Sequence, residues 1–269
     1  MNSESNFVEL KKSGKIWAIG SIHSNLESFK LIKKFILKSF KEDDKLIFLG
    51  NIVGLGEHSK ETLNNVIELR FNLMSKFKLR PETIIFLRGA QEEMFSKLLQ
   101  LQLAPNPTEI LEWMFDHGVN RTIESYGFSE DEVKNIASSG TIKISKWTSK
   151  LNKILRMNPG HTEYFLNLKH AAYSYSKKIL FVNRGVDITR PLSAQNDCFW
   201  WGYQNFSKIN EPYKTFSRIV RGYESSDISE LELKSRVICT LFKQPLSNKR
   251  ILCGVFNDNG EILDIFENN

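Results

Sequence analysis

Apolar positions along the first hundred residues follow two alternating patterns. Three short runs, 15–20, 45–50 and 83–87, are rich in β-branched and aromatic residues and predict buried strands. After each run, a short loop leads into apolar residues at helical spacing. Three consecutive strand–loop–helix units predict a mainly parallel sheet with functional loops at the carboxyl ends of its strands. The predicted helices cover residues 26–40, 60–78 and 91–101.

The rest of the chain predicts a helical segment and then more strands. From 105 to about 178 the apolar spacing is helical, with interruptions at prolines and glycines. The Asn-Gly pair at 259–260 lies between two alternating runs and predicts a β-hairpin. We therefore expect one α/β domain over residues 1–269, with a helical insertion at about 105–178. The later predicted strands cover residues 179–182, 218–220, 236–240, 250–256 and 261–266.

Composition narrows the class of protein. Of the 269 residues, 41% are hydrophobic and 25% are charged, as in an ordinary globular chain. No run approaches the roughly 18 apolar residues of a membrane helix, and residues 1–14 are polar. The three cysteines form no CxxC pair, which favours a reducing compartment over a disulfide framework or a zinc cluster. We expect a cytoplasmic protein without membrane contact.

The net charge of +6 raises the question of a nucleic-acid partner. The lysines are scattered along the chain rather than massed in one segment. This distribution favours a solvated basic surface, and nucleic acid stays an alternative partner without a recognisable binding module.

The three predicted loops carry glycines in a recurrent frame. They read Gly-Ser-Ile-His-Ser over 20–24, Gly-Asn-Ile-Val-Gly-Leu-Gly over 50–56 and Arg-Gly-Ala-Gln-Glu over 88–92. These frames resemble the calcineurin-like metallophosphoesterases, in the branch of diadenosine tetraphosphatases and serine/threonine protein phosphatases. The corresponding family loops read Gly-Asp-x-His-Gly, Gly-Asp-x-Val-Asp-Arg-Gly and Arg-Gly-Asn-His-Glu.

The resemblance continues downstream in the order of the family. Residues 113–127 are similar to its Trp-Leu-x-x-Gly-Gly and Thr-Leu-x-Ser-Tyr-Gly stretches. Residues 180–187 are similar to Leu-Phe-Val-His-Ala-Gly-Ile-Asp, and residues 219–225 stand where Val-Val-His-Gly-His-Thr-Pro is expected. A likeness over nearly the whole chain implies the α/β fold of the family, a two-sheet sandwich flanked by helices.

The resemblance also implies where metal ligands would lie. In the family, two divalent cations, Mn²⁺, Mg²⁺ or Zn²⁺, clamp the phosphate and activate a bridging water. Carboxylates neutralise the two ions, and imidazoles complete their shells. Among the matched metal positions, His23 alone keeps the residue type of the family. The other matched positions hold Ser21, Asn51, Ala90, Asn183, Arg221 and Tyr223.

These replacements change the chemistry of the donors. Ser21 offers a neutral oxygen, and the amide of Asn51 brings no charge to the position of the bridging aspartate. Gln91 stands at the general acid of the family and cannot donate a proton to a leaving oxygen at pH 7. Leu55 replaces the arginine that grips phosphate. The resemblance therefore implies a degenerate centre without catalytic residues or a bound metal.

Three functions stay open at this point. A non-catalytic pseudophosphatase would act as a binding, scaffold or regulatory protein, with a protein partner on the aromatic region 199–216. A weakly active phosphoesterase would hold one Mn²⁺, Mg²⁺ or Zn²⁺ near His23, Asn51 and Asn183, and act on a phosphoprotein or a dinucleoside polyphosphate. A third possibility is polyanion binding without hydrolysis. Its candidate residues are Arg88, Arg184 and Arg221.

Two single residues each allow more than one interpretation. His23 is either a relic ligand or a polar residue hydrogen-bonded inside a former active-site loop. Arg221 can fill the volume of a lost cation and pair with Glu92 or Asp187, or hold a phosphate-bearing ligand. It can equally be a surface arginine after a strand.

Other candidates have simpler interpretations. Adjacent carboxylates at 43–44 and 92–93 are expected on solvated faces, because neighbouring residues of a helix do not face each other. The Gly-His-Thr at 160–162 imitates a terminal family motif but precedes the strand at 179–182. We expect His161 to start a helix after Pro159.

Overall fold

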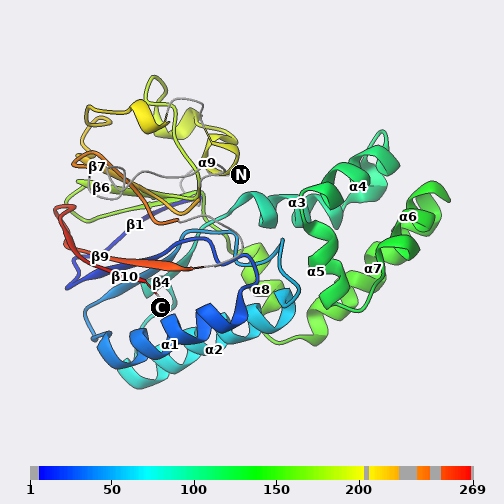
Figure 1. The fold of residues 1–269 in the computed structure, drawn as a ribbon, viewed down its shortest axis with the longest axis horizontal. Helices are drawn as coiled ribbons and strands as arrows, with labels where there is room; N and C mark the ends of the chain where they lie inside the picture. Colours follow the sequence, from blue (N-terminus) through cyan, green and yellow to red (C-terminus); the bar gives the residue numbers. More distant parts are fainter. Residues whose placement is uncertain (1–5, 203–205, 224–234, 243–249, 268–269) are drawn as a thin grey trace.

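The computed structural model describes residues 6–202, 206–223, 235–242 and 250–267. Over these residues, the strands form two five-stranded sheets that face each other, with helices beside them (Figure 1). The first sheet has the order β1-β5-β6-β7-β8, and β6, β7 and β8 are parallel. Its strands are β1 (Phe7–Glu9), β5 (Ala171–Tyr173), β6 (Ile179–Val182), β7 (Arg218–Arg221) and β8 (Ile238–Thr240).

The second sheet has the order β10-β9-β2-β3-β4. The parallel pairing of β2, β3 and β4 confirms the sheet predicted from the first hundred residues. The predicted hairpin is also confirmed, because β9 and β10 pair antiparallel across a turn in which Gly260 has a φ of +88°. The strands are β2 (Ile16–Ile19), β3 (Lys45–Phe48), β4 (Ile84–Phe86), β9 (Leu252–Phe256) and β10 (Ile262–Glu267).

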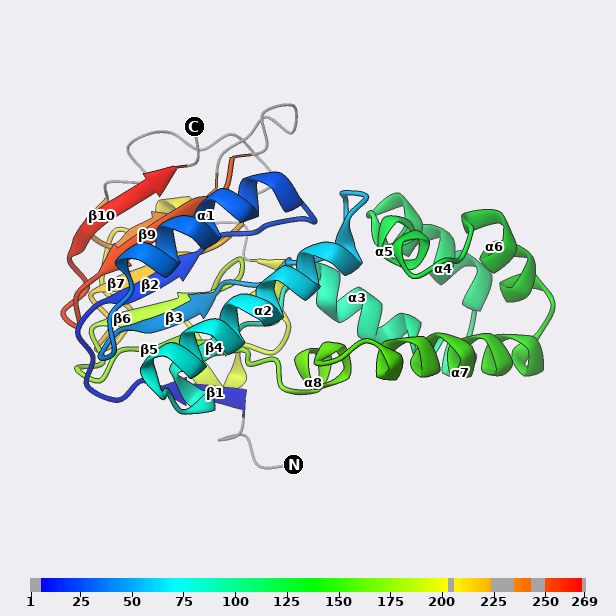
Figure 2. The same ribbon diagram turned by 90° about the horizontal axis from the view of Figure 1, so that it is seen from below.

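Two long helices cover the outer face of the second sheet (Figure 2). α1 (Leu26–Ser39) and α2 (Ser59–Phe77) lie side by side, and their apolar stripes pack on that sheet. Buried side chains such as Phe29 and Leu63 are fully shielded there. A second layer of apolar side chains, among them Ile47 and Phe181, fills the space between the sheets. Burial of these layers is the main term that holds the sandwich together.

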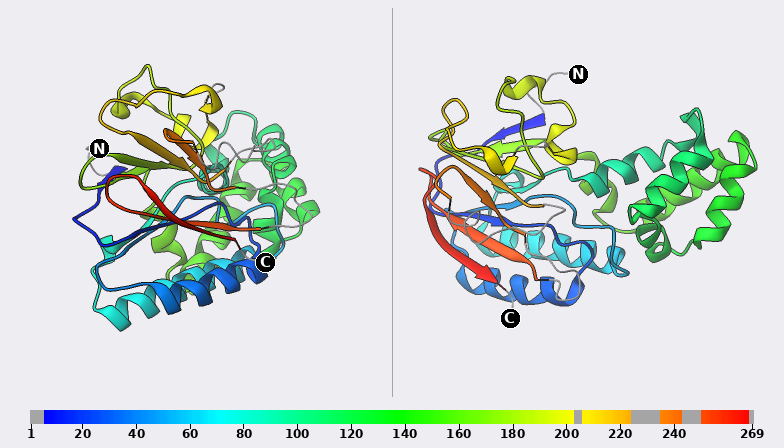
Figure 3. Two further views of the ribbon diagram at one scale, coloured as in Figure 1. Left: turned by 60° about the vertical axis from the view of Figure 1, so that its left-hand side comes forward. Right: turned by 45° about the horizontal axis from the view of Figure 1, so that its top comes forward.

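A helical arm extends from one side of the sandwich (Figures 2 and 3). The helical insertion expected at about 105–178 is confirmed from 107 to 166. The expectation is wrong for residues 171–173, which form the strand β5. There β5 pairs with β1 and β6, partners that local spacing over three residues does not indicate. The helices are α3 (Ala90–Leu98), α4 (Pro107–Asp116), α5 (Val119–Ser125), α6 (Glu130–Ser138), α7 (Thr141–Met157) and α8 (His161–Leu166).

Short helices connect the longer elements. No helix in the described part of the chain is long and apolar enough to cross a bilayer. The short helices are η2 (Pro81–Thr83), η3 (Leu101–Leu103), η4 (Leu192–Ala194), α9 (Cys198–Trp201) and η5 (Phe206–Lys208).

Candidate functional site

The loops after β2, β3 and β4 meet at the carboxyl ends of these strands. The backbone N–H groups of Ile22 and His23 both donate to the carbonyl of Asn51, at 3.0 and 2.8 Å. A Cβ at Gly50 would approach the backbone nitrogen of Gly89 to 2.7 Å, so the second and third loops are in direct backbone contact. Gly50 has a φ of +87°, a conformation that glycine adopts without strain.

The ends of β6 and β7 join the same cluster. Ser21 N–H donates to the carbonyl of Gly222 at 2.9 Å, and Gly222 N–H donates to the carbonyl of Asn183 at 2.8 Å. The Asn183 side chain crosses to the other sheet, where its Nδ2 donates to the carbonyl of Leu49 at 2.6 Å. The structure thus brings together residues that lie far apart in the sequence and that the resemblance assigned to metal positions.

Asn51 ties the three loops together with both ends of its amide. Its Oδ1 accepts the backbone N–H of Gln91 at 3.1 Å, and its Nδ2 donates to Ser21 Oγ at 3.2 Å. The residue is 1% exposed and has a φ of +53°, which asparagine tolerates better than most residues. The polar groups at the first two matched positions therefore bond to each other.

Glu92 is the acidic side chain beneath these loops, and it is fully buried. Its Oε2 accepts N–H groups of Asn51 and Gly89 at 2.7 and 3.0 Å. Its Oε1 accepts the N–H of Ile52 at 2.7 Å and the hydroxyl of Tyr164 at 3.0 Å. Burial raises the pKa of the Glu92 carboxyl, and the surrounding N–H donors oppose that rise.

The expectation of solvated carboxylates is wrong for Glu92, as it is for Asp44. Asp44 is 2% exposed and accepts the indole N–H of Trp17 at 2.9 Å and the backbone N–H of Lys15 at 2.8 Å. In each pair of adjacent carboxylates, N–H donors from other elements hold one carboxylate in the interior. A sequence signal exists for Glu92, which stands three residues after Gly89 at the start of a helix, where it caps the Gly89 N–H.

His23 is buried and contacts two aromatic rings. It is 7% exposed, and its ring lies 5.1 Å from the Tyr223 ring in a T-shaped arrangement. The Phe242 ring lies 6.2 Å away on another side. The φ of His23 is +47°, so the first loop turns sharply at this residue. Two aromatic rings therefore lie against the imidazole that the resemblance assigned to a metal.

The third loop and the second loop contact the helical arm. Gln91 Nε2 donates to the carbonyl of His117 at 2.7 Å, and the backbone N–H of Leu55 donates to the carbonyl of Gly118 at 3.2 Å. The Leu55 side chain is 36% exposed beside Gly118. Ala90, which begins α3, is 8% exposed and contributes a methyl group only. An amide and a leucine thus occupy the positions of the general acid and the phosphate-binding arginine.

The surface interpretation of Arg221 is wrong, because this arginine belongs to β7 and is 2% exposed. Its Nε donates to Thr240 Oγ1 at 2.7 Å, and its guanidinium lies 4.1 Å from the centre of the Phe206 ring. The two carboxylates considered as its partners bond to other groups. Glu92 binds backbone N–H groups, and Asp187 pairs with Arg190 at 3.0 Å.

The three arginines proposed for polyanion binding lie in two separate places. Arg221 Nη1 lies 3.5 Å from the carbonyl of Arg184, and the Arg184 guanidinium lies 5.5 Å from the centre of the Tyr223 ring. Arg88 lies next to α9, where it pairs with Glu93 and lies 5.9 Å from the Trp200 ring centre.

The aromatic region expected to contact a partner is mainly core. Trp201 is half-buried and makes a T-shaped contact with Trp113 at 5.8 Å, and Trp113 is 44% exposed. Tyr203, which belongs to the same region, lies outside the described residues. The buried aromatic residues of the region are Phe199, Trp200, Phe206, Tyr213 and Phe216.

His161 begins α8, as predicted, and is buried. Its Nδ1 accepts the hydroxyl of Tyr126 at 2.6 Å, and its Nε2 donates to Asn64 Oδ1 at 2.8 Å. Burial lowers the pKa of His161 to about 4, so the ring is neutral at pH 7.

Comparison with known proteins identifies the architecture. No family model matches the sequence, and no curated protein matches it. A solved structure of a protein assigned as a diadenosine tetraphosphatase aligns with a TM-score of 0.55 at 14% identity, over 98% of each chain. A protein serine/threonine phosphatase from Saccharomyces cerevisiae aligns at 0.52 and 18% identity, over 98% of this chain and 82% of its own. The chain has the calcineurin-like metallophosphoesterase fold.

A third solved structure with a similar fold is a mutant of a cold-active protein tyrosine phosphatase. It aligns with a TM-score of 0.50 at 12% identity, over 98% of this chain and 85% of its own. The three structural neighbours are thus phosphatases of nucleotide or protein substrates by description. At this level of sequence identity, the similarity shows the fold alone.

The residues at the loop cluster do not fit the dinuclear centre associated with this metallophosphoesterase fold. Such a centre needs carboxylate oxygens, one of them shared by both ions, to balance the charge of two dications. Here Ser21 and Asn51 supply neutral oxygens, and Glu92 is directed into backbone N–H groups. Within the described ranges, no group of three or more His, Cys, Asp or Glu side chains is arranged around a common point.

Proposed function

We propose that this chain is a cytoplasmic pseudophosphatase, a non-catalytic protein that acts by binding as a scaffold or regulator. The observation that carries the proposal is the amide of Asn51, which bonds to Ser21 and to the Gln91 backbone. In an active centre, the same position provides negative charge to two cations. Here it provides a hydrogen-bonded link between loops.

Electrostatics supports the loss of catalysis. Each dication must leave water, and only nearby negative charge compensates that cost. Glu92 is close to the loops, but its oxygens already accept the N–H groups of Asn51, Gly89 and Ile52. A cation that recruited this carboxylate would leave those buried donors unpaired, at about 1–3 kcal/mol each.

Two observations support a protein partner. Two of the structural neighbours are described as phosphatases of proteins, so this fold can present a surface to a protein. At the edge of the loop cluster, Trp113 is 44% exposed and contacts Trp201, while Leu55 is 36% exposed. Exposed tryptophans of this kind are frequent anchors of protein interfaces. No disulfide joins the three cysteines, which agrees with a reducing compartment.

Phosphatase turnover tests the proposal. Wild-type protein and His23→Ala are incubated with p-nitrophenyl phosphate, with EDTA or with added Mn²⁺, Mg²⁺ or Zn²⁺. We expect both proteins to match the protein-free blank under every condition, because the charge needed to hold two cations is missing. Metal-dependent turnover that His23→Ala abolishes would refute the pseudophosphatase.

A weakly active enzyme with one metal is the second candidate. It is favoured by Asn183 Oδ1, a buried oxygen that has no hydrogen-bond partner among the described residues. Asparagine oxygens can ligate hard cations. If this candidate is right, slow Mn²⁺-dependent turnover falls to the blank in both Asn183→Ala and His23→Ala, whereas Thr189→Ala, outside the loop cluster, leaves it unchanged.

A further inference from the structure

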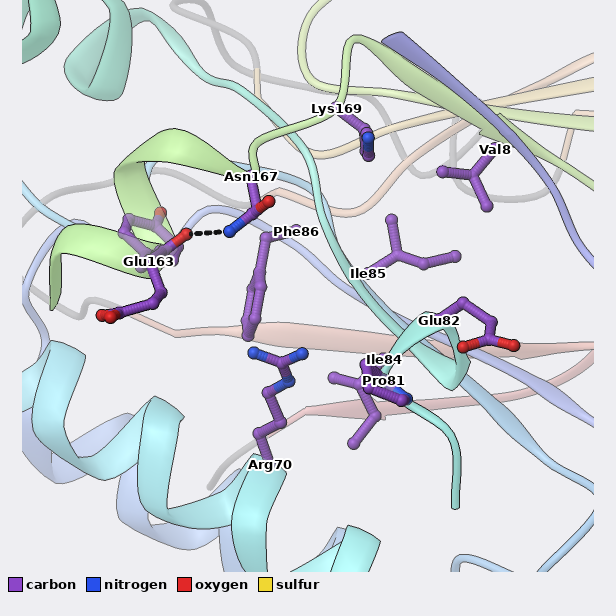
Figure 4. A pocket seen from close by; sticks show the side chains of 11 residues that line it. Val8, Arg70, Pro81, Glu82, Ile84, Ile85, Phe86, Glu163, Asn167 and Lys169 are labelled. Atoms are coloured by element: carbon purple, nitrogen blue, oxygen red, sulfur yellow. Dashed lines mark hydrogen bonds between the residues drawn. The ribbon is translucent and has the colours of Figure 1, made fainter. Parts of the chain in front are cut away.

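A pocket lies away from the loop cluster, where the edge strands of the two sheets approach each other (Figure 4). Its volume is about 320 Å³, within the range of small-molecule sites. One wall is apolar and consists of Val8 from β1 together with Ile84, Ile85 and Phe86 from β4. The opposite side is formed by α2 and α8 (Figure 4). The pocket therefore offers an apolar surface between two sheet edges.

A single arginine enters this pocket from α2. The guanidinium of Arg70 extends toward the Phe86 ring, whose centre is 5.8 Å away (Figure 4). Its Nε is buried and has no hydrogen-bond partner among the described residues. Arg70 also forms no ion pair with another described residue. Burial lowers the pKa of Arg70 from its usual value.

The other charges of the pocket do not neutralise Arg70. Glu82 pairs with Lys11 at 3.4 Å, outside the apolar wall. The Glu163 carboxylate points away from the guanidinium (Figure 4). Lys169 lines the pocket opposite Arg70 and adds a second positive charge. Two cations thus face the apolar wall, and the two carboxylates lie at its margins.

We propose that this pocket binds a small organic monoanion, a carboxylate attached to an apolar body. The carboxylate pairs with the Arg70 guanidinium, whose planar donors match its two oxygens. The apolar body lies against Ile84, Ile85 and Phe86. A half-desolvated guanidinium without a counter-ion is costly, and an anionic ligand removes that cost. The marginal carboxylates Glu82 and Glu163 oppose a dianion such as phosphate.

Methyl NMR tests the site directly. The full chain, labelled with ¹³C at isoleucine δ-methyl groups, is titrated with 3-phenylpropanoate and, separately, with the neutral 3-phenylpropanamide. We expect the acid to move the methyl signals of Ile84 and Ile85, which line the pocket, and the amide to leave them in place. No movement with the acid, or equal movement with both compounds, would overturn the proposal.

Variants assign the effect to Arg70. We expect Arg70→Met to weaken binding of the acid at least about tenfold, because the charge-assisted pair is lost. Arg70→Lys keeps the charge without the fork and should weaken binding less. Arg156→Met, at an exposed arginine of α7, is the matched control and should bind as the wild type does. Unchanged affinity in a folded Arg70→Met or Arg70→Lys protein would contradict the assignment.

Discussion

At the scale of single residues, Asn51 shows how one functional group changes the chemistry of a loop. An aspartate only accepts hydrogen bonds, whereas the amide both donates to Ser21 and accepts from the Gln91 backbone. At Asn51, the polar groups of the loop cluster therefore form hydrogen bonds with one another. The sequence was sufficient to predict which residues meet, because the glycine frames are preserved. It did not indicate how their side chains would pair.

Glu92 gives the sharpest test of this network. Glu92→Gln replaces an acceptor oxygen by an NH₂ group that faces backbone N–H donors. We expect the free energy of unfolding, measured by urea denaturation, to fall by about 2–4 kcal/mol. Glu112→Gln, at an exposed position of α4, is the control and should change it by less than about 0.5 kcal/mol. Equal stability of the two variants would show that Glu92 does not support the loops.

The same residue explains a limit of sequence-based prediction. Neighbouring side chains of a helix diverge, so one carboxylate of a pair can point inward while the other points to solvent. The N–H donors that select Glu92 come from residues 51–53, about forty positions earlier. Asp44 is selected by Lys15 and Trp17 in the same way. Contacts of this kind exist only once the strands have assembled.

The buried imidazole of His161 makes stability depend on pH. Burial lowers its pKa to about 4 from 6.5, so the folded state holds the neutral ring. The stability that this provides is complete above pH 6.5 and is lost as the pH falls toward 4. Between these values, we expect the wild type to lose about 2 kcal/mol more than His161→Gln in urea unfolding. Parallel pH profiles for the two proteins would contradict this assignment.

At the scale of elements, strands were predictable where a run of apolar residues is long enough to show a pattern. β2, β3 and β4 have such runs, and they lie where the pattern places them. β1 and β5 have three residues each, and they pair with each other across more than 160 positions. Their strand conformation comes from this tertiary pairing, which overrides local preference.

Two glycines test the contact between the second and third loops. Gly50 and Gly127 have similar φ values, +87° and +90°, so alanine causes similar backbone strain of about 1 kcal/mol at each. A Cβ at Gly127 meets open space, whereas at Gly50 it meets the backbone of Gly89. We expect Gly50→Ala to reduce the free energy of unfolding by at least about 1–3 kcal/mol more than Gly127→Ala. Equal losses in thermal or urea unfolding would mean that the loops are not packed together.

At the scale of the whole molecule, the two sheets have the architecture of the phosphatases they resemble, and neutral side chains such as Ser21 and Asn51 lie in the loops at their shared edge. The resemblance along the chain predicted the fold, and the structural neighbours confirm it. The pocket at Arg70 was not predictable, because Val8, Arg70 and the β4 residues share no local pattern. It depends on how the sheet edges and α2 come together.

The number of Mn²⁺ ions bound per chain tests the central claim most directly. Wild-type protein and His23→Ala are titrated with Mn²⁺, and the free ion is followed by its electron paramagnetic resonance signal. The account predicts that free Mn²⁺ appears in proportion from the first addition in both proteins, because neutral Ser21 and Asn51 cannot hold two dications. Uptake of two equivalents by the wild type, lost in His23→Ala, would contradict it.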